Sequence, residues 1–167
     1  MLDVPPMSQA GFTPPLAVAF GADHAGVALK DHLAAVLRAE GFAVRDFGTT
    51  GSDSVDNPDF AHRVAAAVSA GVAQVGVLVC GTGIGMSIAA NRHRDIRCAL
   101  AHDVTTARLS RAHNNANVLA LGARVVGEAV ALDCLRAFLA TGFEGGRRVR
   151  RLDQLNPSET SSGNLAS

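Results

Sequence analysis

Short, nearly continuous apolar runs alternate along the chain with stretches in which apolar residues recur every three or four positions. Apolar runs without polar alternation are typical of strands that are covered on both faces. They predict five strands, at residues 16–20, 44–47, 75–79, 97–101 and 118–121. The stretches with helical period predict five helices, at residues 24–40, 59–70, 86–91, 105–113 and 127–139. This alternation predicts an α/β fold with a parallel sheet and right-handed crossovers.

The chain is expected to form one domain between two tails. Its 167 residues suit a single hydrophobic core. Residues 1–15 are interrupted by Pro and Gly and predict a flexible N-terminal extension, whereas the domain itself spans residues 16–155. Residues 156–167 are small and polar and predict a disordered C-terminal tail.

Composition argues against nucleic-acid binding. Fifteen Lys and Arg balance fifteen Asp and Glu, so the formal net charge is zero. Nucleic-acid binders draw much of their affinity from a basic excess. The chain has seven Phe but no Trp or Tyr, so platforms that stack bases are also not expected.

The sequence predicts a cytoplasmic protein that does not enter a membrane. No apolar run approaches the roughly 20 residues that a membrane span needs. The N-terminus lacks the basic and apolar regions of a signal peptide. Cys80, Cys98 and Cys134 form no CxxC pair and suit a reducing compartment.

Polar and glycine residues follow several of the predicted strands. Ligands of parallel sheets bind beyond the carboxyl ends of the strands. One crevice should therefore gather Asp23, residues 80–85, His102 and residues 122–124. For Asp23, the ordinary interpretation is an N-cap of the first helix, which is compatible with a functional one.

Glycines at positions 81, 83 and 85 form the clearest candidate site. Such a segment aims backbone N–H groups at a phosphate or an oxyanion. It is not a P-loop, because no Lys-Ser/Thr pair follows. A dinucleotide site is disfavoured because Met86 occupies the place of the third glycine, although Asp103 lies about twenty residues further on, as that motif requires. A purely structural turn stays open.

Single residues leave alternatives open. Cys80 closes a strand just before the glycines, so it is a candidate catalytic thiol, but a buried cysteine is more often a core residue. Cys98 and Cys134 are expected in the core. His113 ends a helix, where it would also be a favourable partner of the helix dipole.

No metal or other cofactor is expected, because the six histidines form no HxxxH or HExxH pair. If the C-terminal basic run is helical, Arg147 and Arg151 share one face and could clamp a phosphate. A solvated basic turn is the more usual explanation.

Together these segments resemble the ribose-5-phosphate isomerase B family, which also includes galactose-6-phosphate and allose-6-phosphate isomerases. The matching residues are 19–26, 80–85, 88–91, 113–117 and 144–147, in the family's order. The resemblance covers about residues 16–155. It implies a three-layer αβα sandwich with a five-stranded parallel, Rossmann-like sheet. It also implies homodimers whose active sites draw on both chains, some of which pair into tetramers.

The resemblance further implies a mechanism and a role for each site residue. His113, with Asp23 opposite, would open the sugar ring, and Cys80, assisted by Thr82, would then move a proton through an enediolate. Some family members use a Glu at the position of Met86; methionine cannot accept a proton, so the cysteine mechanism follows. The implied substrate-binding residues are His24, Gly81, Gly83, Ile84, Gly85, Asn114, Arg124, Arg147 and Arg151.

One departure concerns the substrate. The family commonly has a Tyr where this chain has Asn57, and that Tyr lines the sugar pocket. The first expectation is ribose 5-phosphate; the alternative is another sugar phosphate, such as a tetrose 4-phosphate, allose 6-phosphate or galactose 6-phosphate. A non-catalytic sugar-phosphate-binding protein and a nucleotide-binding oxidoreductase are the rival classes.

Overall fold

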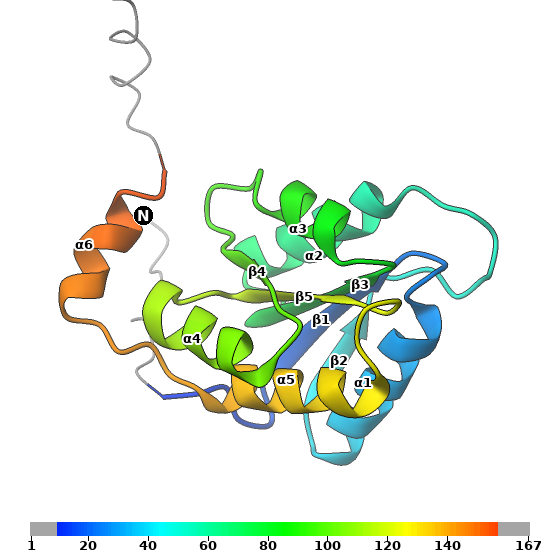
Figure 1. The fold of residues 1–167 in the computed structure, drawn as a ribbon, viewed down its shortest axis with the longest axis horizontal. Helices are drawn as coiled ribbons and strands as arrows, with labels where there is room; N and C mark the ends of the chain where they lie inside the picture. Colours follow the sequence, from blue (N-terminus) through cyan, green and yellow to red (C-terminus); the bar gives the residue numbers. More distant parts are fainter. Residues whose placement is uncertain (1–9, 157–167) are drawn as a thin grey trace, which may run out of the picture.

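A five-stranded parallel sheet forms the centre of the computed structural model, which describes residues 10–156 (Figure 1). Its strands are β1 (Ala17–Ala22), β2 (Ala43–Asp46), β3 (Val75–Cys80), β4 (Cys98–Leu100) and β5 (Val118–Gly122). Their order across the sheet is β2-β1-β3-β5-β4, and every neighbouring pair is parallel. The predicted α/β fold with five parallel strands is confirmed.

Helices cover both faces of this sheet, which confirms the three-layer arrangement. One face carries α1 (Val27–Ala39), α4 (Val104–Asn114) and α5 (Glu128–Ala140), and the other carries α2 (Asn57–Ser69) and α3 (Ile84–Ala90) (Figure 1). A sixth helix, α6 (Arg147–Asp153), lies beside α4 and away from the sheet (Figure 1). The C-terminal basic run is therefore helical.

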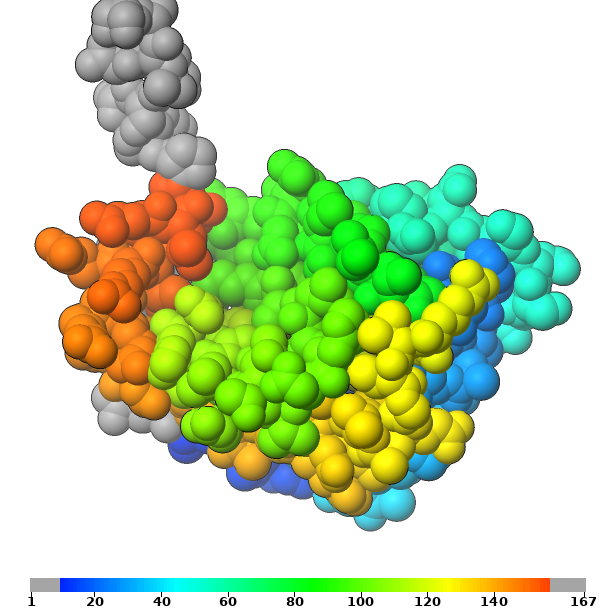
Figure 2. All heavy atoms as spheres, in the orientation of Figure 1, coloured from blue at the N-terminus to red at the C-terminus, as the bar shows by residue number. Residues whose placement is uncertain are grey.

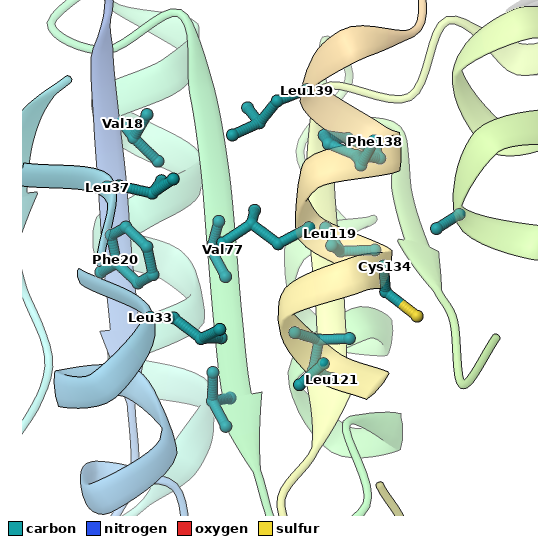
Figure 3. Close-up of a cluster of buried hydrophobic side chains, with 14 of the residues drawn as sticks. Val18, Phe20, Leu33, Leu37, Val77, Leu119, Leu121, Cys134, Phe138 and Leu139 are labelled. Atoms are coloured by element: carbon teal, nitrogen blue, oxygen red, sulfur yellow. The ribbon is translucent and has the colours of Figure 1, made fainter. Parts of the chain in front are cut away.

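The larger core cluster lies between the sheet, α1 and α5 (Figure 3). Val18, Phe20 and Val77 of the central strands face Leu33 of α1 and Phe138 of α5, and all five are fully buried. Each such side chain contributes about 1.5–3 kcal/mol on burial. Cys134 also lies in this cluster, so the expectation of a core residue is confirmed.

The start of α1 differs from the sequence prediction. Asp23 was expected to cap a helix from residue 24, but the cap residue is Gly26. Asp23 Oδ1 instead accepts hydrogen bonds from the N–H groups of Ala25 (3.0 Å) and Gly26 (3.2 Å), so it closes a turn ahead of the helix. The delay has a steric reason: Gly26 crosses the end of β3 so closely that a Cβ would lie 2.2 Å from the Val79 carbonyl oxygen.

Helix α3 begins at Ile84, two residues before the predicted start at Met86. Gly83 has a φ of +79°, a left-handed conformation that glycine adopts without strain. The chain therefore reverses at a single residue, and the helix follows at once. The other boundaries shift by up to three residues, as with residues 24–40 against Val27–Ala39.

A buried lysine joins the first helix to an edge strand. Lys30 of α1 is fully buried and pairs with Asp46 of β2 and with Asp31 (2.7 Å). Burial lowers the pKa of Lys30, but hydrogen bonds to Asp31 and Asp46 and their charges outweigh it, so the pKa is raised from 10.5. Because the folded-state pKa lies above the unfolded one, the stabilisation is fully present below pH 10.5 and is lost as pH rises through the folded value.

Lys30→Met should lower the free energy of unfolding by about 1.5–3 kcal/mol, because the substitution removes the charge-assisted hydrogen bond from Lys30 to Asp46. Urea unfolding at pH 7 measures this change. The matched control is Arg136→Met, which removes an exposed pair with Glu40 and should cost less than about 1 kcal/mol. Equal losses in the two variants would contradict the prediction.

Candidate active site

The carboxyl ends of β1, β3 and β5 meet at one edge of the sheet. Cys80 ends β3 and is paired with Gly122 of β5, while Ala22 of β1 is paired with Val79. The Arg124 N–H donates to the Gly81 carbonyl oxygen (3.0 Å), so the segment after β5 lies on the glycine loop. The residues after these strands therefore lie together at this end of the sheet, as the sequence pattern predicted.

The Cys80 sulfur lies inside the glycine loop. Its residue is only 3% exposed, and Sγ accepts a hydrogen bond from the Gly83 N–H (3.1 Å). A backbone donor directed at sulfur stabilises negative charge there. Cys80 also packs in the smaller core cluster, so the core interpretation is correct, and the catalytic interpretation stays a prediction.

The other two cysteines have a different environment. Burial raises the pKa of Cys98 to about 12, which keeps this thiol protonated at neutral pH. Burial, with smaller effects of the Asp103 and Asp133 charges, also raises the pKa of Cys134. Neither residue lies at the carboxyl edge of β3.

The glycine loop offers free backbone donors. Among residues 10–156, the N–H groups of Gly81, Thr82 and Gly85 have no hydrogen-bond acceptor. The Thr82 hydroxyl accepts from the Ile84 N–H (3.3 Å), which closes the turn. The loop can therefore direct several donors at an anion outside the helix start.

The same glycines also have a packing role. A Cβ at Gly83 would lie 2.5 Å from Leu100 Cδ1, and one at Gly122 would lie 2.7 Å from the Thr82 carbonyl oxygen. The structural interpretation of this turn is thus correct for Gly83. A Cβ at Gly85 would lie 3.1 Å from Asn57 Oδ1, so the Asn57 amide lies against the glycine loop.

Two histidines flank the glycine loop. His24 Nδ1 accepts from the Val55 N–H (3.4 Å), so a neutral His24 carries its proton on Nε2 and can donate it to an anion. His102 Nε2 lies 3.3 Å from the Thr82 carbonyl oxygen. The sequence predicted that His102 lies near this site, because it follows a buried strand, but assigned it no function.

The remaining predicted site residues lie at the opposite edge of the sheet. Helix α4 begins just beyond β4 and ends at Asn114, four residues before Val118 starts β5. His113 and Asn114 are therefore at the amino ends of the strands. The Glu144 N–H donates to the Ala112 carbonyl oxygen (3.1 Å), and α6, with Arg147 and Arg151, packs beside α4.

Within one chain, the predicted site residues therefore form two separate sets. We call Asp23, His24, residues 80–85 and Arg124 the carboxyl-edge set, and we call His113, Asn114, Arg147 and Arg151 the amino-edge set. Figure 2 shows the corresponding ends of the molecule, with the segment that follows β5 (yellow) at one end and α6 (orange) at the other. The length of the strands separates the two sets.

A hollow adjoins the amino-edge set. Its volume is about 440 Å³, and β4, α4 and α6 supply Cys98, Asn114 and Leu152 to its lining. Two large apolar side chains on α3, Ile84 and Ile88, are 50% and 52% exposed. The chain therefore has a partly apolar pocket beside β4, and two exposed isoleucines on α3.

Within residues 10–156, no three His, Cys, Asp or Glu side chains are grouped so that they could hold a metal ion. No helix in this described part of the chain is long and apolar enough to span a bilayer.

Comparison with known proteins identifies the family of the chain. Residues 18–155 match the Ribose/Galactose Isomerase family model. Ribose-5-phosphate isomerase B of Escherichia coli is 44% identical over 142 residues, 85% of this chain and 95% of that protein. D-erythrulose-4-phosphate isomerase of Pectobacterium atrosepticum is 41% identical, over 84% and 93%.

A solved structure extends the likeness to the fold. Ribose-5-phosphate isomerase B of Clostridium thermocellum superposes with a TM-score of 0.83 at 47% identity, covering 83% of this chain and 94% of that one. Sequence and fold agree over nearly the whole domain. The chain belongs to the ribose/galactose isomerase family and is an aldose–ketose isomerase of the ribose-5-phosphate isomerase B type.

Proposed function

We propose that the protein interconverts ribose 5-phosphate and ribulose 5-phosphate through an enediolate, with Cys80 as the base. The observation that carries this proposal is the Cys80 sulfur, which lies 3.1 Å from the Gly83 N–H inside a loop with further free donors. A thiolate and an oxyanion site side by side are what enolisation next to a carbonyl requires. Met86 is fully buried and apolar, so it offers no competing base.

Each proton and electron pair has a destination in the proposed reaction. His113 and Asp23 open the sugar ring by proton transfer. Cys80 takes the C2 proton, the C–H electron pair forms the C1–C2 double bond, and the carbonyl oxygen at C1 becomes an oxyanion. The N–H groups of the glycine loop and Thr82 stabilise that charge. The O2 hydroxyl then passes its proton to O1, the freed O2 electron pair forms the C2 ketone, and the C1–C2 double-bond pair takes the proton that Cys80 returns to C1.

The phosphate is assigned to hydrogen-bond donors from both sets. His24 is held with Nε2 as the proton-bearing atom by the Val55 N–H. Arg124 lies over the glycine loop, where a Cβ at Gly81 would be 3.5 Å from its Nη1. Arg147 and Arg151 stand four residues apart on α6, a spacing that suits a clamp on one phosphate. Asn114 would bind sugar hydroxyls.

A second copy of the chain must bring the two sets together. The carboxyl-edge and amino-edge sets lie at opposite ends of the strands, so one sugar phosphate cannot contact both within one chain. A homodimer in which each chain supplies one set to each site solves this with closed symmetry. The exposed Ile84 and Ile88 of α3 and the hollow at β4 offer apolar surface for that interface.

The experiment that tests the substrate compares ribose 5-phosphate with erythrose 4-phosphate, allose 6-phosphate and galactose 6-phosphate, without added metal. We expect kcat/KM to be at least about tenfold higher for ribose 5-phosphate, because pocket shape separates sugars of different length. Coupled assays or NMR measure each conversion. Turnover of none of the four would contradict the proposed function.

A tetrose 4-phosphate is the second candidate substrate. Asn57 lies against Gly85 where the family commonly has a Tyr, and a relative at 41% identity is named D-erythrulose-4-phosphate isomerase. An amide offers hydrogen bonds where an aromatic ring offers an apolar wall. Preference for the tetrose in the same assay would keep the mechanism and change the substrate.

A further inference from the structure

A buried arginine without a carboxylate partner lies beneath the amino-edge set. Arg111 of α4 is 2% exposed, and no salt bridge joins it to a carboxylate in the described part of the chain. Burial, and then the nearby charge of Arg97, lowers its pKa to about 10. Arg111 is therefore still cationic at neutral pH.

The guanidinium instead binds the end of its own helix and a neighbouring loop. Nη1 donates to the Asn115 side-chain oxygen (2.8 Å) and to the Ala116 carbonyl oxygen (2.6 Å). Nε donates to the Thr141 carbonyl oxygen beyond α5 (3.3 Å). Burial of a charged group lowers the stability of the fold unless hydrogen bonds compensate it. The three acceptors provide that compensation, and the guanidinium in turn fixes the segments that carry them.

The segment it holds immediately follows His113 and Asn114. Asn115 has a φ of +45° and is the one non-glycine residue with positive φ between residues 10 and 156. Arg97 Nε donates to the Asn115 carbonyl oxygen (2.9 Å) while Arg111 holds its side chain. Two guanidinium groups thus fix the left-handed turn that ends α4.

A residue outside the family match completes this arrangement. The Phe12 ring covers the Arg111 guanidinium at 4.4 Å, with Phe138 at 5.8 Å. The Phe12 N–H donates to the Leu139 carbonyl oxygen (2.6 Å), and a Cβ at Gly11 would lie 2.5 Å from the Ala140 carbonyl oxygen. Phe12 belongs to the predicted N-terminal extension, and the family model begins only at residue 18. Residues 10–15 therefore include part of the cover of Arg111; residues 1–9 and 157–167 lie outside the described residues.

We propose that Arg111 is a positioning residue for His113 and Asn114, and that Phe12 of the extension is part of that device. The inference rests on the proposed function, because it assigns these two residues to the reaction. Arg111 touches no substrate atom; it acts through the turn at Asn115. The desolvated cation–π contact with Phe12 strengthens the hold on the guanidinium.

The first variant is Arg111→Met, which keeps the volume and removes the charge and its donors. We expect kcat for ribose 5-phosphate to fall by about tenfold to a hundredfold, because small misplacements of a catalytic group have effects of this size. KM should change much less than kcat, since the phosphate ligands on α6 are untouched and only the hydroxyl contact of Asn114 is displaced. Arg111→Lys should recover only part of kcat, because a single ammonium group cannot donate to the same acceptors in the planar geometry of a guanidinium. Arg108→Met, on the exposed face of the same helix, is the control and should change nothing.

A second readout separates positioning from general damage. Ribulose 5-phosphate cannot close a furanose ring through its phosphorylated O5, so its enolisation at C1 needs Cys80 but no ring opening. Arg111→Met should therefore still exchange the C1 hydrogen of ribulose 5-phosphate with D₂O, as NMR would record, within about threefold of the wild-type rate. Loss of exchange and isomerisation in equal measure would overturn the positioning role.

The third variant, Phe12→Ala, keeps the test decisive if Arg111→Met does not fold. It should lower kcat about threefold to tenfold with the same pattern in KM and exchange. Unchanged kcat in a folded Arg111→Met, or in Phe12→Ala when the first variant is unfolded, would overturn the inference. Wild-type protein that neither isomerises nor exchanges would instead show that the proposed function fails.

Discussion

Cys80→Ala should lower kcat for ribose 5-phosphate by about 10³- to 10⁴-fold, since general base catalysis contributes up to about that much. The residue ends β3, and its sulfur accepts the Gly83 N–H. Without the sulfur, no side chain between Cys80 and Gly85 except the Thr82 hydroxyl can carry the proton. Stopped-flow or NMR assays of the purified variant measure this loss.

The fold and the phosphate site should survive this change. Removing one buried sulfur costs about 1–2 kcal/mol, and none of the proposed phosphate ligands is altered. Calorimetric titration with inorganic phosphate should give the wild-type affinity. Cys134→Ala, at a buried cysteine in the α5 core, is the matched control and should keep full activity. Wild-type turnover by Cys80→Ala would eliminate Cys80 as the base.

A dimer of one Cys80→Ala chain and one His113→Ala chain should regain about half of the wild-type activity, although each variant alone is nearly inactive. If every site combines the carboxyl-edge set of one chain with the amino-edge set of the other, one of the two sites in this heterodimer carries both substitutions. The second site carries neither. Co-expression with two different affinity tags, followed by tandem purification, isolates the heterodimer for assay.

The control heterodimer combines Cys80→Ala with Asp23→Ala. Both residues belong to the carboxyl-edge set, so each of its sites keeps one defect and no activity should return. Recovery in this control, or none in the first heterodimer, would refute a site shared in the proposed way. A protein that elutes as a monomer in size-exclusion chromatography would refute it as well.

The sequence alone determined the fold class and most of the helices and strands. The central strands β3 and β5 are apolar throughout, because helices cover both of their faces. Glycine and proline mark where the chain must turn, as Pro58 does at the start of α2. These signals are local: period and turn chemistry depend on a few neighbouring residues, so they can be identified without the tertiary structure.

Local patterns were less informative where a distant strand sets the geometry. Asp23 is a good N-cap residue, yet Gly26 must first pass over Val79 of β3 before α1 can begin. Gly83 likewise starts α3 early because it packs against Leu121 of β5 and Leu100 of β4. In both cases the deciding contact joins residues far apart in the chain.

The tertiary structure decided how the candidate site is divided. From the sequence, residues 80–85 and His113 are parts of one motif set, but the antiparallel course of α4 carries His113 back to the amino edge of the sheet. The contact of Phe12 with Arg111 was equally out of reach of the sequence, because it joins residues 99 positions apart. Residue types and periods specify which elements form, whereas the direction of each element in the packed sheet specifies which side chains meet; that direction is a property of the whole chain.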